Sequence, residues 1–147
     1  MSVTASDLLK MSRSGLDDVF RSSPPGSIPN GRSNGTAIFF PGSWVGVIPR
    51  WLVRLLVWKG KFFRRGDQGS SLKNLITPFA FHLFEAKVYK DDSWFADGEA
   101  VILDYSQSSF LVSSIRDEIR QVADGLYLGQ VFLGKKRVLL FMLEFPS

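Results

Sequence analysis

The second half of the chain alternates between apolar and polar positions, a pattern that predicts β-strands. Gly134-Lys135-Lys136 separates the last two apolar stretches and indicates a closing hairpin. Apolar residues dominate both faces of the final strand, with Glu144 as the exception, so we expect that strand to be covered on both sides. The expected strands cover residues 36–40, 61–64, 79–89, 99–105, 125–133 and 137–145.

Three segments show helical spacing instead. The first, residues 6–20, has Ser6 and Asp7 as candidate caps and an interruption at Ser14-Gly15. The second, residues 49–58, begins with a proline that fits a first helical turn. The third, residues 110–123, carries the clearest apolar stripe, formed by Leu111, Ile115, Ile119 and Val122.

Proline and glycine dominate residues 22–35, which predicts a loop that acts as a lid or wraps tightly over the fold. The expected strands, helices and loop together predict a mainly β (α+β) fold, an antiparallel β-barrel with two or three accessory helices. The 147 residues fit a single domain. Its N-terminal helix and loop occupy residues 1–35, and the barrel occupies residues 36–147.

The layout of the chain resembles that of a calycin, the lipocalin-like class of ligand-binding barrels. The resemblance lies in a glycine-rich segment (Gly31 to Gly35), the late predicted helix and the closing hairpin of residues 125–145. Gly42-Ser43-Trp44 has the Gly-x-Trp spacing of lipocalins, but it follows the first predicted strand instead of preceding it. The resemblance implies a cavity for a hydrophobic ligand and no particular chemistry.

The composition narrows the chemistry. The chain has no Cys and one His, which excludes disulfides, thiol nucleophiles, cysteine-ligated metals and multi-histidine metal sites. Gly31 to Gly35 lacks the Lys-Ser/Thr ending of a phosphate-binding loop, and no dinucleotide fingerprint follows a strand. We therefore expect no cofactor and no metal. The first twenty residues show no secretory signal, so we expect a cytoplasmic protein.

Four residues are candidates for acid–base catalysis in an apolar pocket. His82 is the single imidazole, and it is either a general acid or base or a buried structural histidine. Asp104 shares a predicted face with apolar residues, so it either acts in the cavity or pairs with Arg116 or Arg120. Two tyrosines would donate hydrogen bonds inside the pocket or belong to the core. The four candidates are Asp104, His82, Tyr105 and Tyr127.

Five further residues are candidates for contacts with a ligand. Aromatic side chains would line the cavity. The two arginines of the predicted helix 110–123 would bind a carboxylate or phosphate at the barrel mouth. Alternatively these arginines lie on a solvated face, where Asp117 pairs with Arg120 at i,i+3. The candidates are Phe84, Trp58, Arg116, Arg120 and Phe141.

Residues 50–65 are basic, contain Trp51 and Trp58, and include no acidic residue. They form either a helix packed on the barrel or a peripheral contact with an anionic membrane. An exposed apolar helix face at residues 51–58 would equally suit a homodimer interface. The net charge of +4 is modest and no nucleic-acid-binding module is visible, so we expect no nucleic-acid partner.

Two functional hypotheses follow from the sequence. The first is a protein that binds a hydrophobic small molecule, such as a lipid, terpenoid or polyketide-like compound, inside the barrel. The thirteen Phe of the chain favour this cavity over a solid core, the alternative. The second is a cofactor-independent isomerase, cyclase, hydratase or lyase that acts on such a molecule by acid–base catalysis in the same cavity.

Overall fold

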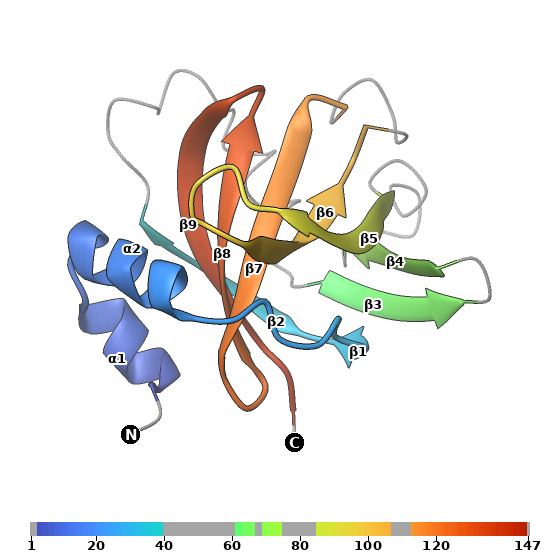
Figure 1. Cartoon of the computed structure of the whole chain (residues 1–147). Helices are drawn as coiled ribbons and strands as arrows, with labels where there is room; N and C mark the ends of the chain where they lie inside the picture. The colour runs from blue at the N-terminus through green and yellow to red at the C-terminus, as the bar shows by residue number, and fades with distance from the viewer. Residues whose placement is uncertain (1–2, 40–60, 67–68, 75–84, 107–112, 147) are drawn as a thin grey trace.

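A computed structural model describes residues 3–39, 61–66, 69–74, 85–106 and 113–146 (Figure 1). Every strand pair in the described ranges is antiparallel, and the strands form one nine-stranded sheet in the order β1-β3-β4-β5-β6-β7-β8-β9-β2. The strands are β1 (Gly31–Arg32), β2 (Asn34–Phe39), β3 (Lys61–Gly66), β4 (Gly69–Asn74), β5 (Glu85–Asp92), β6 (Glu99–Asp104), β7 (Ile115–Ala123), β8 (Leu126–Leu133) and β9 (Lys136–Glu144). The protein is therefore mainly β, as the sequence predicts.

Most of the predicted strands are confirmed. Within residues 36–40, 61–64, 99–105, 125–133 and 137–145, the described residues form β2, β3, β6, β8 and β9 respectively. Only the last part of the predicted strand 79–89 falls within the described residues, where β5 continues to Asp92. The prediction missed β4, because its sequence of glycine, serine and asparagine reads as a turn.

The predicted helix over residues 110–123 is wrong, because Ile115–Ala123 forms β7. Ile115 and Ile119 are four residues apart, a spacing that fits one side of a helix and also one face of a strand. Charged residues are buried on both faces of β7, with Asp117 on one and Glu118 on the other. These charges hide the strand alternation, which normally shows as apolar residues at every second position.

Two short helices precede the sheet, α1 (Ala5–Lys10) and α2 (Arg13–Ser22), where the sequence predicts one interrupted helix. The interruption lies at Met11 and Ser12, because Ser12 caps α2 by accepting a hydrogen bond from the backbone N–H of Gly15 at 3.1 Å. The predicted caps Ser6 and Asp7 are wrong, because both lie inside α1 and Thr4 is its N-cap; Asp7 instead accepts a hydrogen bond from the Thr4 backbone N–H in a capping box.

The two helices cover one face of the sheet, here called the outer face (Figure 1). Leu8, Leu16 and Phe20 of the helices pack against apolar side chains of β6, β8 and β9. The opposite face, here called the inner face, carries the larger apolar cluster, with members from β5 to β9. The final strand contributes buried side chains to both clusters, Met142 to the outer and Phe141 to the inner, which confirms that it is covered on both sides.

Residues 23–30 of the predicted loop 22–35 wrap over the sheet. The prediction is wrong for its last part, because Gly31–Arg32 forms β1 and β2 begins at Asn34. Pro25 O accepts a hydrogen bond from the backbone N–H of Gln121 at 3.3 Å, and Ser27 O accepts one from the Tyr127 hydroxyl at 2.7 Å. Ile28 packs against the inner-face cluster. The segment therefore covers one end of the inner face, as the wrapping alternative predicts.

Candidate functional site

A carboxylate lies in the middle of the apolar inner face. Asp117 on β7 is fully buried, and its neighbours along the strand on the same face are Ile115 and Ile119. In the ladders, Asp117 is directly opposite Leu103 of β6 and Val131 of β8, so these side chains project from the same face. Apolar residues therefore flank Asp117 on four sides within the sheet.

Three of the predicted site residues share this inner face. Tyr105, Tyr127 and Phe141 are buried members of the inner-face cluster. Tyr105 lies one residue beyond the β6–β7 ladder, in a position diagonal to Asp117. The hydroxyl of Tyr127 is directed to Ser27 O, at the end of the face that the wrapping segment covers.

The Phe141 ring on the inner face packs directly against Gly129 of β8. A Cβ atom at this position would lie 2.4 Å from Cζ of Phe141 and 2.8 Å from Cγ2 of Ile119. No real contact is that short, so the absence of a side chain at Gly129 gives the Phe141 ring its place. The inner face is thus closely packed around the Phe141 ring.

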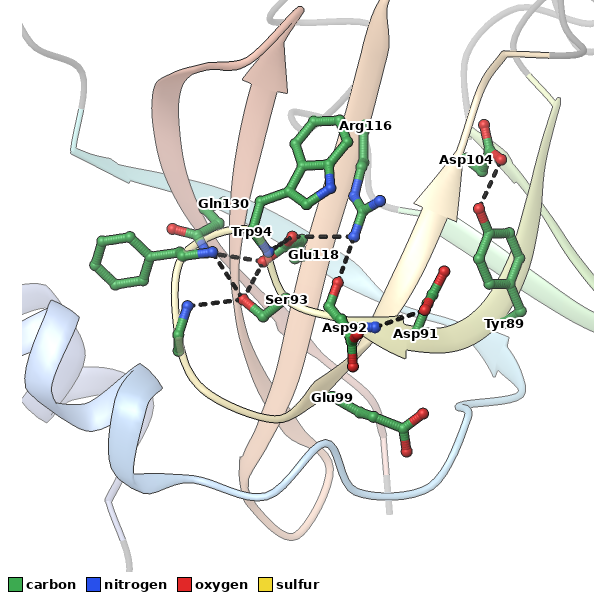
Figure 2. Close-up of polar contacts among 12 residues, drawn as sticks. Tyr89, Asp91, Asp92, Ser93, Trp94, Glu99, Asp104, Arg116, Glu118 and Gln130 are labelled. Atoms are coloured by element: carbon green, nitrogen blue, oxygen red, sulfur yellow. Dashed lines mark hydrogen bonds and ion pairs between the residues drawn. The ribbon is translucent and has the colours of Figure 1, made fainter.

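Asp104 is directed to the outer face and is separated from Tyr105 and Tyr127. Its carboxylate accepts a hydrogen bond from the Tyr89 hydroxyl at 2.7 Å (Figure 2). It accepts another from the backbone N–H of Ser106 at 2.8 Å. Burial raises the pKa of Asp104, but hydrogen bonds from Ser106 and Tyr89 and the Arg116 charge outweigh it and lower the pKa below its usual value. Burial and the bond to Asp104 raise the pKa of Tyr89 to about 12.

Arg120, predicted to bind a ligand, is 2% exposed and holds elements together instead. Its guanidinium donates to the carbonyl oxygens of Phe20 and Arg21 at the end of α2, at 3.0 and 3.3 Å. It also donates to those of Asp97 and Glu99 at 2.7 and 3.0 Å. These contacts join α2 and the segment before β6 to β7. The predicted i,i+3 pair with Asp117 is wrong, because the two side chains leave β7 on opposite faces.

Glu118 is a buried carboxylate that several side chains and a backbone N–H contact, a role that the sequence did not predict (Figure 2). It accepts hydrogen bonds from the Ser93 hydroxyl at 2.7 Å, the Trp94 backbone N–H at 2.6 Å and the Gln130 amide at 3.2 Å. Arg116 forms an ion pair with it at 3.2 Å. The contacts with Ser93 and Trp94 hold the start of segment 93–98 against the outer face, and the other two join Glu118 to β7 and β8. Reading residues 115–119 with a period of two would have placed Glu118 and Asp117 on opposite buried faces.

The remaining predicted residues cannot be placed in the same way. His82, Phe84 and Trp58 lie outside the described residues. The same is true of the predicted helix over residues 49–58, while residues 61–66 form β3. Contact of residues 50–65 with a membrane or a second copy therefore stays a prediction.

Within the described ranges, no group of three His, Cys, Asp or Glu side chains is arranged to hold a metal ion. No helix there is long and apolar enough to cross a membrane.

Comparisons with known proteins define the fold and not the activity. No family model and no curated protein matches the chain. Its structure is similar to a crystal structure of a protein from Thermomonospora curvata, with a TM-score of 0.57 and 18% sequence identity. The similarity covers 93% of this chain and 89% of that chain. At this identity the likeness shows a common mainly β, antiparallel-sheet fold alone.

Proposed function

We propose that this protein binds an apolar small molecule against the inner face of its sheet, with Asp117 as the polar contact. The observation that carries the proposal is the position of Asp117, a fully buried carboxylate flanked by Leu103, Ile115, Ile119 and Val131. Ligand sites of this kind are mostly apolar and have a few polar groups that orient the ligand. A carboxylate favours a ligand that carries a hydroxyl or another hydrogen-bond donor.

The proposed architecture is a calycin-like barrel around this face. β1 and β2 stand at the two ends of the strand order, yet only the buried Ser33 separates them in the chain. β1 pairs with β3 and β2 pairs with β9. A bend at Ser33 would thus join the two edges and enclose the inner face, and Figure 1 shows the strong curl of the sheet that this closure needs.

The test is a fluorescence titration with N-phenyl-1-naphthylamine, a neutral apolar probe, followed by displacement with 1-decanol or decanoate. We expect saturable probe binding. We also expect 1-decanol to displace the probe at least about tenfold better than decanoate, because Asp117 repels a carboxylate. Asp117→Asn should remove this discrimination.

Asp104→Asn is the matched control, because it makes the same change on the neighbouring strand but on the outer face. It should retain the discrimination of the parent protein. The proposal fails if the probe does not bind saturably. It also fails if Asp117→Asn and Asp104→Asn show the same preference for 1-decanol over decanoate.

A second candidate function is a cofactor-independent enzyme that uses the same face. It is favoured by one observation, the placement of Tyr105 diagonal to Asp117 on the inner face. A carboxylate and a phenol can divide the roles of base and acid in an isomerase, cyclase, hydratase or lyase. In that case the displacement assay would identify the substrate. The Asp117→Asn variant would still bind this substrate but would not turn it over, whereas the Asp104→Asn variant would retain turnover.

A further inference from the structure

A pocket lies on the opposite side of the sheet from Asp117. This outer pocket has a volume of about 370 Å³, and it lies between the ends of β5 and β6, the start of β7 and the β8–β9 turn. Its volume is at the small end of the range for ligand sites. Its principal side chains are Tyr89, Trp94, Asp104, Ser114, Arg116 and Lys135.

Two cations line the outer pocket, and one of them, Arg116, is paired with Glu118. Arg116 and Lys135 face one carboxylate, Asp104, which is already occupied by Tyr89 and the backbone N–H of Ser106. In the described part of the chain, Lys135 forms no ion pair, and its ammonium lies 5.3 Å from the centre of the Trp94 ring. An anionic group in the pocket would gain attraction from Lys135 and from the Arg116 guanidinium, whose charge is partly offset by Glu118 at 3.2 Å.

The arrangement of Arg116 and Trp94 is held in place before any ligand binds. Figure 2 shows the Arg116 guanidinium beside the indole, with its carbon 4.0 Å from the ring centre. Arg116 Nη2 donates to Asp92 O at 2.8 Å, and Glu118 holds both Arg116 and the Trp94 backbone. Trp94 nevertheless stays 45% exposed, so a rigid aromatic surface borders the two cations.

We propose that the outer pocket binds a small aromatic anion, a carboxylate or a phosphate ester. The anionic group lies between Arg116 and Lys135, and the aromatic body contacts the exposed surface of Trp94. Planar guanidinium and indole groups both favour flat aromatic partners. This site does not depend on the proposed function of the inner face, because the two lie on opposite faces of β7.

The test uses isothermal titration of the whole chain with benzoate and with phenyl phosphate. Benzyl alcohol serves as the uncharged analogue, and inorganic phosphate serves as the anion without an aromatic body. We expect both aromatic anions to bind saturably and at least about tenfold more tightly than the two analogues, with an affinity that falls as salt is added.

Lys135→Gln, in the exposed turn, should weaken both aromatic anions about tenfold, because it removes one of the two cations. Trp94→Leu should weaken them by a similar factor. Lys90→Gln makes the same charge change at an exposed lysine that does not line the pocket, and it should have no effect. Binding of N-phenyl-1-naphthylamine should be equal in all three variants.

Three results would overturn the proposal. The first is an absence of saturable binding by benzoate and phenyl phosphate. The second is equal affinity in Lys135→Gln and Lys90→Gln. The third is inorganic phosphate binding as tightly as phenyl phosphate, which would indicate an adventitious ion only.

Discussion

Glu118 shows what a single buried carboxylate contributes to this protein. It is the acceptor for three donors and the partner of Arg116, and no part of it is exposed. Buried charges are tolerated where every acceptor site is used, and removing one member leaves the others unsatisfied. Its contacts fix the segment that carries Trp94, so the outer pocket depends on it as well.

Glu118→Gln should lower the free energy of unfolding by about 2–4 kcal/mol, because it replaces a charged acceptor with an amide that brings two unneeded donors. Urea unfolding measures this loss. Glu99→Gln, at an exposed side chain, should change the stability by less than about 0.5 kcal/mol. Equal effects of the two substitutions would contradict the role given to Glu118.

The Tyr89–Asp104 hydrogen bond makes a pH-dependent contribution to stability. The pKa of Tyr89 is raised to about 12, so its contribution is complete below the ordinary value near 10 and is lost as the pH rises through about 12. The pKa of Asp104 is lowered, so its contribution is present above the ordinary value and is lost as the pH falls through the lower folded value.

Tyr89→Phe should therefore destabilise the protein at neutral pH, and the difference from the parent should shrink above about pH 10. Unfolding free energies of both proteins at neutral and alkaline pH measure this. A difference that stays constant up to the alkaline limit of folding would show that the hydrogen bond does not shift the titration of Tyr89.

At the scale of elements, Arg120 joins α2 to the sheet. Its guanidinium reaches the last carbonyl oxygens of α2 and two carbonyl oxygens beside β6. Cations at a helix C-terminus also interact favourably with the helix dipole. Because the fork of the guanidinium serves both elements at once, lysine cannot replace it.

Arg120→Lys should lower the free energy of unfolding by about 2–4 kcal/mol and speed amide hydrogen exchange in α2 more than in β8. Hydrogen exchange resolved by residue measures the difference. Arg21→Lys, at an exposed position on the same helix, is the control and should leave exchange in α2 close to the parent. Unchanged protection of α2 in Arg120→Lys would contradict the proposed link.

How far the sequence predicts an element depends on where its charges lie. The closing hairpin was predictable, because β9 is apolar on both faces and a glycine marks its turn. β7 was not, because Asp117, Glu118 and Arg120 are buried there at positions where strands usually carry apolar residues. Their partners come from distant segments, including α2 and residues 93–98, which local patterns do not show.

The same limit applies to the candidate sites. Tyr105, Tyr127 and Phe141 could be assigned to one face from alternation alone, and the structure places them together. Asp117 was assigned to a helix surface, so its place on the inner face could not be seen. Arg116 was predicted to bind an anion at a barrel mouth; it lines the outer pocket, where anion binding is our proposal.

At the scale of the whole molecule, one sheet presents two faces of different character. The outer face is closed by helices and a polar network, with a small pocket lined by Arg116, Lys135 and Asp104 at its edge. The inner face is apolar around Asp117. Neighbouring residues of one strand place their side chains on opposite faces: on β6, Leu103 lies on the inner face and Ile102 on the outer face.

The most direct test is methyl-resolved NMR of the protein with bound N-phenyl-1-naphthylamine, using intermolecular nuclear Overhauser effects. We predict contacts from the probe to the methyl groups of Leu103, Ile119 and Val131 on the inner face. We predict none to those of Ile102 and Leu128, which lie on the outer face of the same sheet. Contacts to the outer-face methyl groups alone, or no contacts at saturation, would contradict the inner ligand site.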